Sequence, residues 1–82
     1  GLLEQLQHVS LEVAREGGTL GAVFNAANEV AVGAFLEKRL PFAGIYRVIR
    51  ATIDRHSNCK ADRVEAIMEA DRWARAEAKR CL

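Results

Sequence analysis

Apolar residues recur every three or four positions in four separate segments of this 82-residue chain. That spacing places them along one face of an α-helix, and no segment shows the alternation of apolar and polar residues that is typical of a half-buried strand. We therefore predict helices over residues 2–16, 19–39, 41–56 and 61–81. Because the connections are short, consecutive helices should run antiparallel. The expected fold is all-α, an up-down antiparallel four-helix bundle formed by residues 1–82 as a single helical domain.

Residues that favour turns and helix ends separate the predicted helices. Gly17 and Gly18 can adopt the left-handed conformation that closes a helix without a steric penalty. Thr19 follows as the expected N-cap of the second helix. Asp62 is the expected N-cap of the fourth helix, with Glu65 three residues later to approximate a capping box. Each of these boundaries thus has a local physical cause.

The predicted core is rich in alanine and poor in aromatic side chains, which make up 6% of the chain. This composition favours helices over sheets and requires the layers to pack closely on small side chains. The residues expected to face the core are Leu2, Leu6, Val9 and Val13, then Leu20, Val23, Phe24, Ala27, Ala31, Ala34 and Phe35, then Phe42, Ile45, Tyr46, Ile49 and Ile53, and finally Val64, Ile67, Met68, Ala74 and Ala78.

The charge pattern argues against two classes of partner. The chain has 12 Lys and Arg against 11 Asp and Glu, a formal net charge of +1, and acids and bases are interleaved. Nucleic acids and anionic membranes are usually bound by a face of one sign, so neither is expected as a partner. No apolar run approaches the ~20 residues that are needed to cross a bilayer.

Residue types that could carry chemistry are scattered along the chain. Cys59 and Cys81 form no CxxC motif, and His8 and His56 add no metal-ligand spacing. Free thiols and solvated or helix-end histidines are therefore favoured over a disulfide, a metal site or a catalytic pair. We predict no catalytic, cofactor-binding or metal-binding residue in this chain.

A polar stripe interrupts the second predicted helix. Asn25, Asn28 and Glu29 share one face, although asparagine is a poor residue for a helix interior because its amide competes for backbone hydrogen bonds. The stripe is either a solvated surface or a hydrogen-bonding seam that meets another helix of this chain or a second domain. Small residues around the helix, among them Ala26 and Gly33, would let another backbone approach closely. We favour the seam.

One long run resembles the C-terminal domain of 1-deoxy-D-xylulose 5-phosphate (DXP) reductoisomerase: GGTLGAVFNAANEVAVGAFLEKRLPFAGI, residues 17–45. That family shows a Gly-Gly-Thr turn, a Leu-Asn-Ala-Ala-Asn-Glu-like core, an alanine-rich helix ending in Ala-Phe-Leu, and a phenylalanine after a short turn. Phe24 stands here in place of the usual leucine, and Gly21 where many members carry proline. The segment DRWAR, residues 71–75, is similar to the closing helix of the family.

The resemblance implies part of an enzyme. The family rearranges and reduces DXP to 2-C-methyl-D-erythritol 4-phosphate in non-mevalonate isoprenoid synthesis, using NADPH and Mg²⁺ or Mn²⁺. Its nicotinamide site belongs to an N-terminal Rossmann domain and its metal site to a central catalytic domain. These two domains are the expected partners, in a homodimeric enzyme of the cytoplasm or, in a eukaryote, the plastid. The segment alone should be inactive, and monomeric or weakly associating.

The expected role of this segment is to brace the catalytic domain. The residues assigned to that boundary, or to pinning the bundle itself, are Asn25, Asn28, Glu29, Asp71, Trp73 and Arg75. For Trp73, a place in a core layer is the plainer explanation. Three alternatives stay open: a stand-alone helical protein-interaction module, a small DNA-binding domain and, least favoured, an independent small enzyme. The start at Gly1 fits either removal of a methionine or a position within a longer chain.

Overall fold

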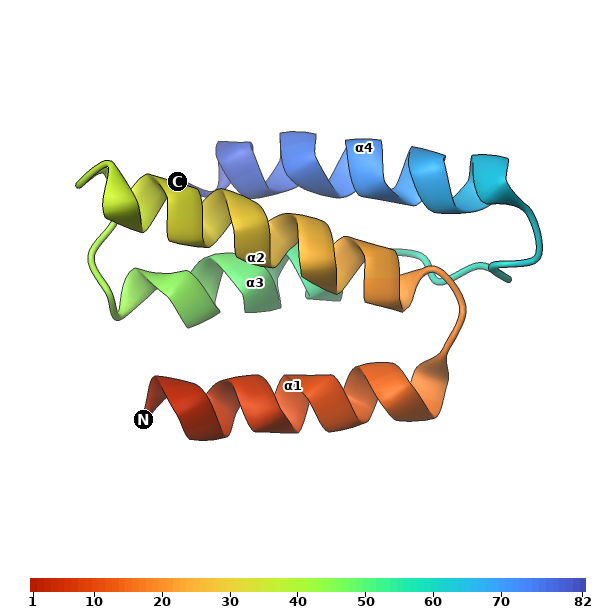
Figure 1. Ribbon diagram of the computed structural model, residues 1–82, viewed down its shortest axis with the longest axis horizontal. Helices are drawn as coiled ribbons and strands as arrows, with labels where there is room; N and C mark the ends of the chain where they lie inside the picture. Colours follow the sequence, from red (N-terminus) through yellow and green to blue (C-terminus); the bar gives the residue numbers. More distant parts are fainter.

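The computed structural model describes residues 1–82 as four helices without strands. The helices are α1 (Leu2–Glu16), α2 (Leu20–Leu36), α3 (Gly44–Asp54) and α4 (Val64–Arg80). Consecutive helices run in opposite directions, with α2 and α3 in the middle, α1 on one side and α4 on the other (Figure 1). The two outer helices do not contact each other. The predicted all-α fold of four packed helices is confirmed.

The end of α2 is set by a tight turn. The helix stops at Leu36, before the predicted residue 39, because Lys38 adopts a left-handed conformation with a φ of 64°. The N–H groups of Lys38 and Arg39 then donate to the carbonyls of Phe35 (3.0 Å) and Ala34 (2.8 Å). This is the hydrogen-bond pattern of a Schellman motif, with lysine at the position that glycine usually holds.

Neither predicted N-cap side chain acts as one. Thr19 holds the cap position of α2, but its hydroxyl bonds residues of the α3–α4 connection instead of the first N–H groups of the helix. Asp62 lies outside α4, because the chain is still extended at Arg63, which holds the cap position without a side-chain bond. The capping box predicted for Asp62 and Glu65 is therefore wrong. The two glycines that close α1 do have positive φ, as expected.

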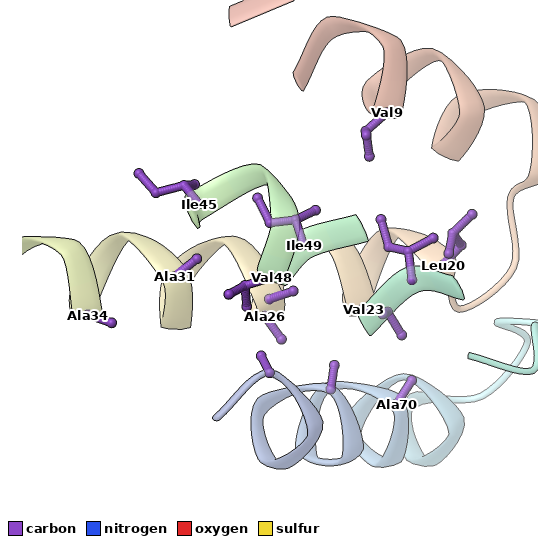
Figure 2. Packing of buried hydrophobic residues seen from close by; sticks show 14 of the residues in the cluster. Val9, Leu20, Val23, Ala26, Ala31, Ala34, Ile45, Val48, Ile49 and Ala70 are labelled. Carbon is purple, nitrogen blue, oxygen red and sulfur yellow. The ribbon is translucent and has the colours of Figure 1, made fainter. Parts of the chain in front are cut away.

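Small side chains bring α2 and α4 close together. The buried alanines are Ala26, Ala27, Ala31 and Ala34 on α2 and Ala70, Ala74 and Ala78 on α4. Figure 2 shows Val48 and Ile49 of α3 in the middle of this cluster, with Val9 of α1 on one side and Ala70 of α4 on the other. The predicted core faces of α2 and α3 are largely confirmed, with the two phenylalanines of α2 packed at the edge of the cluster.

The first turns of α4 depart from the predicted core. Val64, Ile67 and Met68 are exposed, so their assignment to the core is wrong. The N-terminal end of α4 extends past that of α2 (Figure 1), so α2 does not run alongside the first turns of α4. Phe42 precedes α3 and is also exposed. Trp73 is 37% exposed, so it lies at the surface and not in a core layer.

α1 is attached by few contacts. Val9 is its only fully buried residue, and three further apolar side chains pack against the core in part. Beside them, the Glu12 carboxylate accepts two hydrogen bonds of 3.0 Å from the Arg50 guanidinium of α3. These bonds hold the pKa of the Glu12 carboxyl below its ordinary value. A bidentate pair of this kind fixes both the distance and the orientation of the two helices.

Candidate functional site

A polar network joins α2 to α4, and we call its members the polar quartet: Asn25, Glu29, Asp71 and Arg75. The Asn25 amide donates to Glu29 Oε2 (2.8 Å), and the same oxygen lies 3.4 Å from Arg75 Nη2. Arg75 also donates to both carboxylate oxygens of Asp71, at 2.8 and 3.2 Å. The bonds to Asp71 and Glu29 raise the pKa of Arg75. The structure thus brings four of the six predicted boundary residues together.

The other two predicted boundary residues lie elsewhere. Asn28 is half-buried on α2, and its side chain makes no hydrogen bond within the chain. Trp73 stands against the imidazole of His56, with ring centroids 5.4 Å apart and an interplanar angle of 39°. Asn28 therefore keeps both its amide donor and its carbonyl acceptor available for another partner.

A second polar cluster ties the α1–α2 turn to the α3–α4 connection, and we call it the loop clamp: Thr19, His56, Asn58 and Cys59. The Thr19 N–H donates to the Cys59 carbonyl (2.8 Å), and the Cys59 N–H donates to the Thr19 hydroxyl (3.2 Å). Asn58 Oδ1 accepts the N–H of Leu20 at 3.1 Å. The first N–H of α2 is therefore capped by a side chain from a distant loop.

The loop clamp explains the glycine pair before α2. A Cβ on Gly18 would overlap the Cys59 carbonyl oxygen and lie 2.7 Å from Asn58 Oδ1. Glycine is therefore required by close backbone approach as well as by its positive φ. Asn58 Nδ2 also donates to the Gly17 carbonyl at 3.2 Å.

Sequence reasoning found this turn but missed the residues that close on it. Asn58 and Cys59 contact Thr19 from 39 and 40 positions along the chain, which no local pattern encodes. The one available signal was the Ser-Asn pair at residues 57–58, since asparagine often bonds backbone groups in turns.

The Thr19 hydroxyl is the centre of the clamp. It is buried, and its Oγ1 lies 2.8 Å from His56 Nε2 and 3.3 Å from Asn58 Oδ1. Burial lowers the pKa of His56 below its ordinary value of 6.5, which favours the neutral ring. A neutral ring protonated on Nε2 can donate to the Thr19 hydroxyl, which also accepts the Cys59 N–H and donates its own hydrogen to Asn58 Oδ1. The cluster is then fully hydrogen-bonded without any charge on the histidine.

An open cleft of about 390 Å³ borders the clamp between α4 and the α3–α4 connection. His56, Cys59 and Trp73 are among the residues that line it. The Cys59 thiol donates to the Ser57 carbonyl (3.5 Å), and the Arg55 guanidinium pairs with a glutamate of α4. The one hydroxyl–imidazole pair at the cleft is Thr19 with His56, and its hydroxyl is buried and already bonded to Asn58 and Cys59 within the clamp.

The arrangement of side chains and helices also bears on metal and membrane binding. No group of three or more His, Cys, Asp or Glu side chains is positioned to hold a metal ion. None of the four helices combines the length and the apolarity that crossing a bilayer demands. The loop clamp and the polar quartet each join elements that are far apart in sequence.

The fold and these two networks define a small all-α domain whose polar residues bind its own helices and loops together. Within that class, the chain belongs to the family of DXP reductoisomerase C-terminal domains, which it matches over residues 5–77. The resemblance noted in the sequence is thereby confirmed.

Relatives that carry the full name of the enzyme agree with this family. The 1-deoxy-D-xylulose 5-phosphate reductoisomerase of Thermodesulfovibrio yellowstonii is 44% identical over 72 residues, which cover 88% of this chain and 19% of the relative. The protein of the same name from Pelotomaculum thermopropionicum is 49% identical over 67 residues, covering 82% of this chain and 17% of the relative. The chain therefore spans less than a fifth of the length of these relatives.

Proposed function

We propose that this chain is the C-terminal helical support domain of a 1-deoxy-D-xylulose 5-phosphate reductoisomerase. In this proposal it braces the catalytic part of the enzyme and supplies no reacting group. The NADPH-dependent conversion of DXP to 2-C-methyl-D-erythritol 4-phosphate belongs to the rest of the polypeptide. The observation that carries the proposal is the match to the C-terminal domain of this family over residues 5–77.

The cofactors of that reaction are assigned elsewhere because the donor groups of this chain do not suit them. Mg²⁺ and Mn²⁺ need several oxygen ligands close together, whereas Glu12, Glu29, Asp71 and Glu77 each pair with an arginine. A dinucleotide pyrophosphate is normally held by a glycine-rich turn between a strand and a helix, and this chain has no strand.

The two polar networks support a bracing role. The loop clamp fixes one end of the bundle by joining the α1–α2 turn to the α3–α4 connection, and the polar quartet holds α2 to α4 along their sides. A domain tied in this way can transmit a fixed geometry to a neighbour. We place the polar quartet and Trp73 in this internal bracing, and Asn28, whose amide has no partner within the chain, at the boundary with the catalytic domain.

A chimera tests the proposed function. In the T. yellowstonii enzyme, the segment that aligns with this chain would be replaced by this chain, and a truncated form of the enzyme would end before that segment. We expect DXP-dependent NADPH oxidation by the chimera within about tenfold of the parent enzyme, and none by the truncated enzyme. A soluble, folded chimera that is as inactive as the truncated enzyme would contradict the proposal and favour a separate interaction module.

Two variants of the chimera test the absence of a reacting group. His56→Gln and Glu69→Gln change the imidazole and the carboxylate among the side chains that line the cleft beside the loop clamp. We expect kcat and its pH profile to stay as in the chimera. A large fall in kcat with unchanged thermal stability would show that this domain does supply a catalytic group.

Asn28 gives a sharper test of the boundary. In the chimera, Asn28→Ala should lower thermal stability or turnover, because a hydrogen-bonding group of the interface is lost. Asn25→Ala is the matched control, since it breaks only an exposed bond to Glu29 and should have a smaller effect. Equal behaviour of the two variants would remove Asn28 from the boundary.

The proposal also includes the compartment and the oligomeric state of the enzyme. The relatives are bacterial, which supports the cytoplasm over a plastid. Dimerisation is assigned to the rest of the enzyme, so the C-terminal segment should add little to subunit association.

A further inference from the structure

Three large apolar side chains lie together on the surface at the start of α4. We call Val64, Ile67 and Met68 the α4 apolar face, and all three are exposed. Their spacing of three and four residues puts them on one side of the helix. Single exposed apolar residues are ordinary on protein surfaces, but a contiguous group marks a surface that another element covers.

Nothing within this chain covers the α4 apolar face. The first buried residue of α4 is Ala70, and the turns before it extend past the N-terminal end of α2 (Figure 1). α1 lies on the opposite side of the bundle and does not contact α4. The three side chains therefore have the spacing of a core stripe without a partner helix.

Polar residues continue the same side of α4. Asp71 and Arg75 follow Met68 by about one and two helical turns, and they bond each other and Glu29 of α2. At its C-terminal edge the α4 apolar face is thus bordered by polar groups that are bonded to one another. An apolar centre with polar groups at its edge is the arrangement found in protein–protein contacts.

We propose that the α4 apolar face docks against the part of the reductoisomerase polypeptide that lies outside this segment, an inference that rests on the proposed function. The relatives supply this occupant, because the chain spans only 19% and 17% of their length. A second copy of the chain fits less well, since a stable dimer interface takes about 20–30 residues a side. A tethered neighbour needs a smaller contact, because the linkage raises its effective concentration to about the millimolar range.

Cysteine labelling in the active chimera tests the docking. Met68→Cys places a thiol in the α4 apolar face, and Asp54→Cys places one at a polar surface position at the end of α3; Met68 is 59% exposed and the Asp54 side chain 61% exposed, so the two sites are matched. Each enzyme is pulsed with a maleimide, and modification of the new cysteine is read by peptide mass spectrometry. Rates are normalised to those of the same enzyme unfolded in urea. Native Cys59, which is exposed, serves as an internal reference.

We expect the cysteine at position 68 to react at least about tenfold more slowly than the cysteine at position 54 in the folded enzyme. Equal rates at the two positions would overturn the inference, and so would slow labelling at position 68 that becomes fast when the enzyme is diluted, because a second copy would then be the cover. An inactive chimera would contradict the proposed function, and this result is distinct from the labelling result. An active chimera with an open α4 apolar face would refute only the docking.

Discussion

Removing the side chain of Asn58 should destabilise the fold although this residue lies in an exposed loop. Asn58 Oδ1 is the acceptor for the N–H of Leu20, which is buried at the start of α2, and its amide also bonds the Gly17 carbonyl. A buried N–H without an acceptor costs about 1–3 kcal/mol, and loss of a helix cap costs typically about 1 kcal/mol. For Asn58→Ala we expect a loss of about 2 kcal/mol, because the Gly17 carbonyl can bond water instead.

Urea unfolding of the chain measures this loss. With a slope of about 1–2 kcal/mol per M for a protein of this size, the midpoint should fall by roughly 1–2 M. Far-UV circular dichroism reports the helices, and the fluorescence of Trp73, the only tryptophan, reports the region of the clamp because its ring stands against His56. The two signals should give the same midpoint if unfolding is two-state.

Two control variants distinguish loss of the hydrogen bond that caps α2 from a general effect of substitution in this loop. Asn58→Asp keeps an oxygen for the Leu20 N–H and puts a negative charge at the N-terminus of α2, so it should stay within about 1 kcal/mol of the parent. Ser57→Ala changes a neighbour whose hydroxyl bonds nothing in the chain and should be neutral within about 0.5 kcal/mol. Asn58 does not cap α2 if Asn58→Ala is as stable as Ser57→Ala, or if Asn58→Asp is as unstable as Asn58→Ala.

The remaining predictions use the same unfolding assay. Gly33→Ala should stabilise the chain by about 0.5–1 kcal/mol, because Gly33 lies within α2 and an added Cβ would meet no atom within 4 Å; no gain would mean that the backbone there is not helical or is crowded. Burial lowers the pKa of His56 in the folded state, so the unfolded state binds more protons as the pH falls. The neutral ring therefore contributes stability that is fully present above about pH 6.5. This stability is lost as the pH falls through the pKa of the folded state. The urea midpoint should therefore drop between about pH 7.5 and about pH 5, and His56→Gln should reduce that drop, whereas an unchanged pH dependence would exclude His56 as its source. Arg50→Lys should lower the free energy of unfolding by about 1 kcal/mol, because an ammonium group cannot reproduce the two parallel bonds to Glu12. Arg50→Met removes both bonds and should lower it by at least as much.

Local patterns predicted α2 well and the start of α4 poorly, although both carried the same three-four spacing. The alanines of α2 are buried because α3 and α4 both lie against them. Val64, Ile67 and Met68 were assigned to the core on equal evidence, yet they are exposed and α2 does not run alongside them. Periodicity identifies which side of a helix is apolar, but it does not show whether another helix packs against that particular turn.

The same limit applies to polar residues. Asn25 was recognised as unusual because asparagine costs helix stability, and Glu29 because it shares the same helix face; both properties are local. Their connection to Arg75 depends on the packing of α2 against α4, which brings together residues 46 positions apart, 29 and 75. The sequence therefore identified candidates for a seam without identifying its other half.

The amino-acid sequence by itself determined the number and kind of helices, the alanine-rich character of their contacts, the glycine turn after α1 and the family of the chain. These properties depend on spacing within one segment or on similarity to related sequences. Only the tertiary structure decided that Asn58 caps α2, that Thr19 bonds the α3–α4 connection, and that the first turns of α4 stay uncovered. The reason is that such contacts depend on how connections orient whole helices, and that orientation results from all the packing energies together and not from any local run of residues.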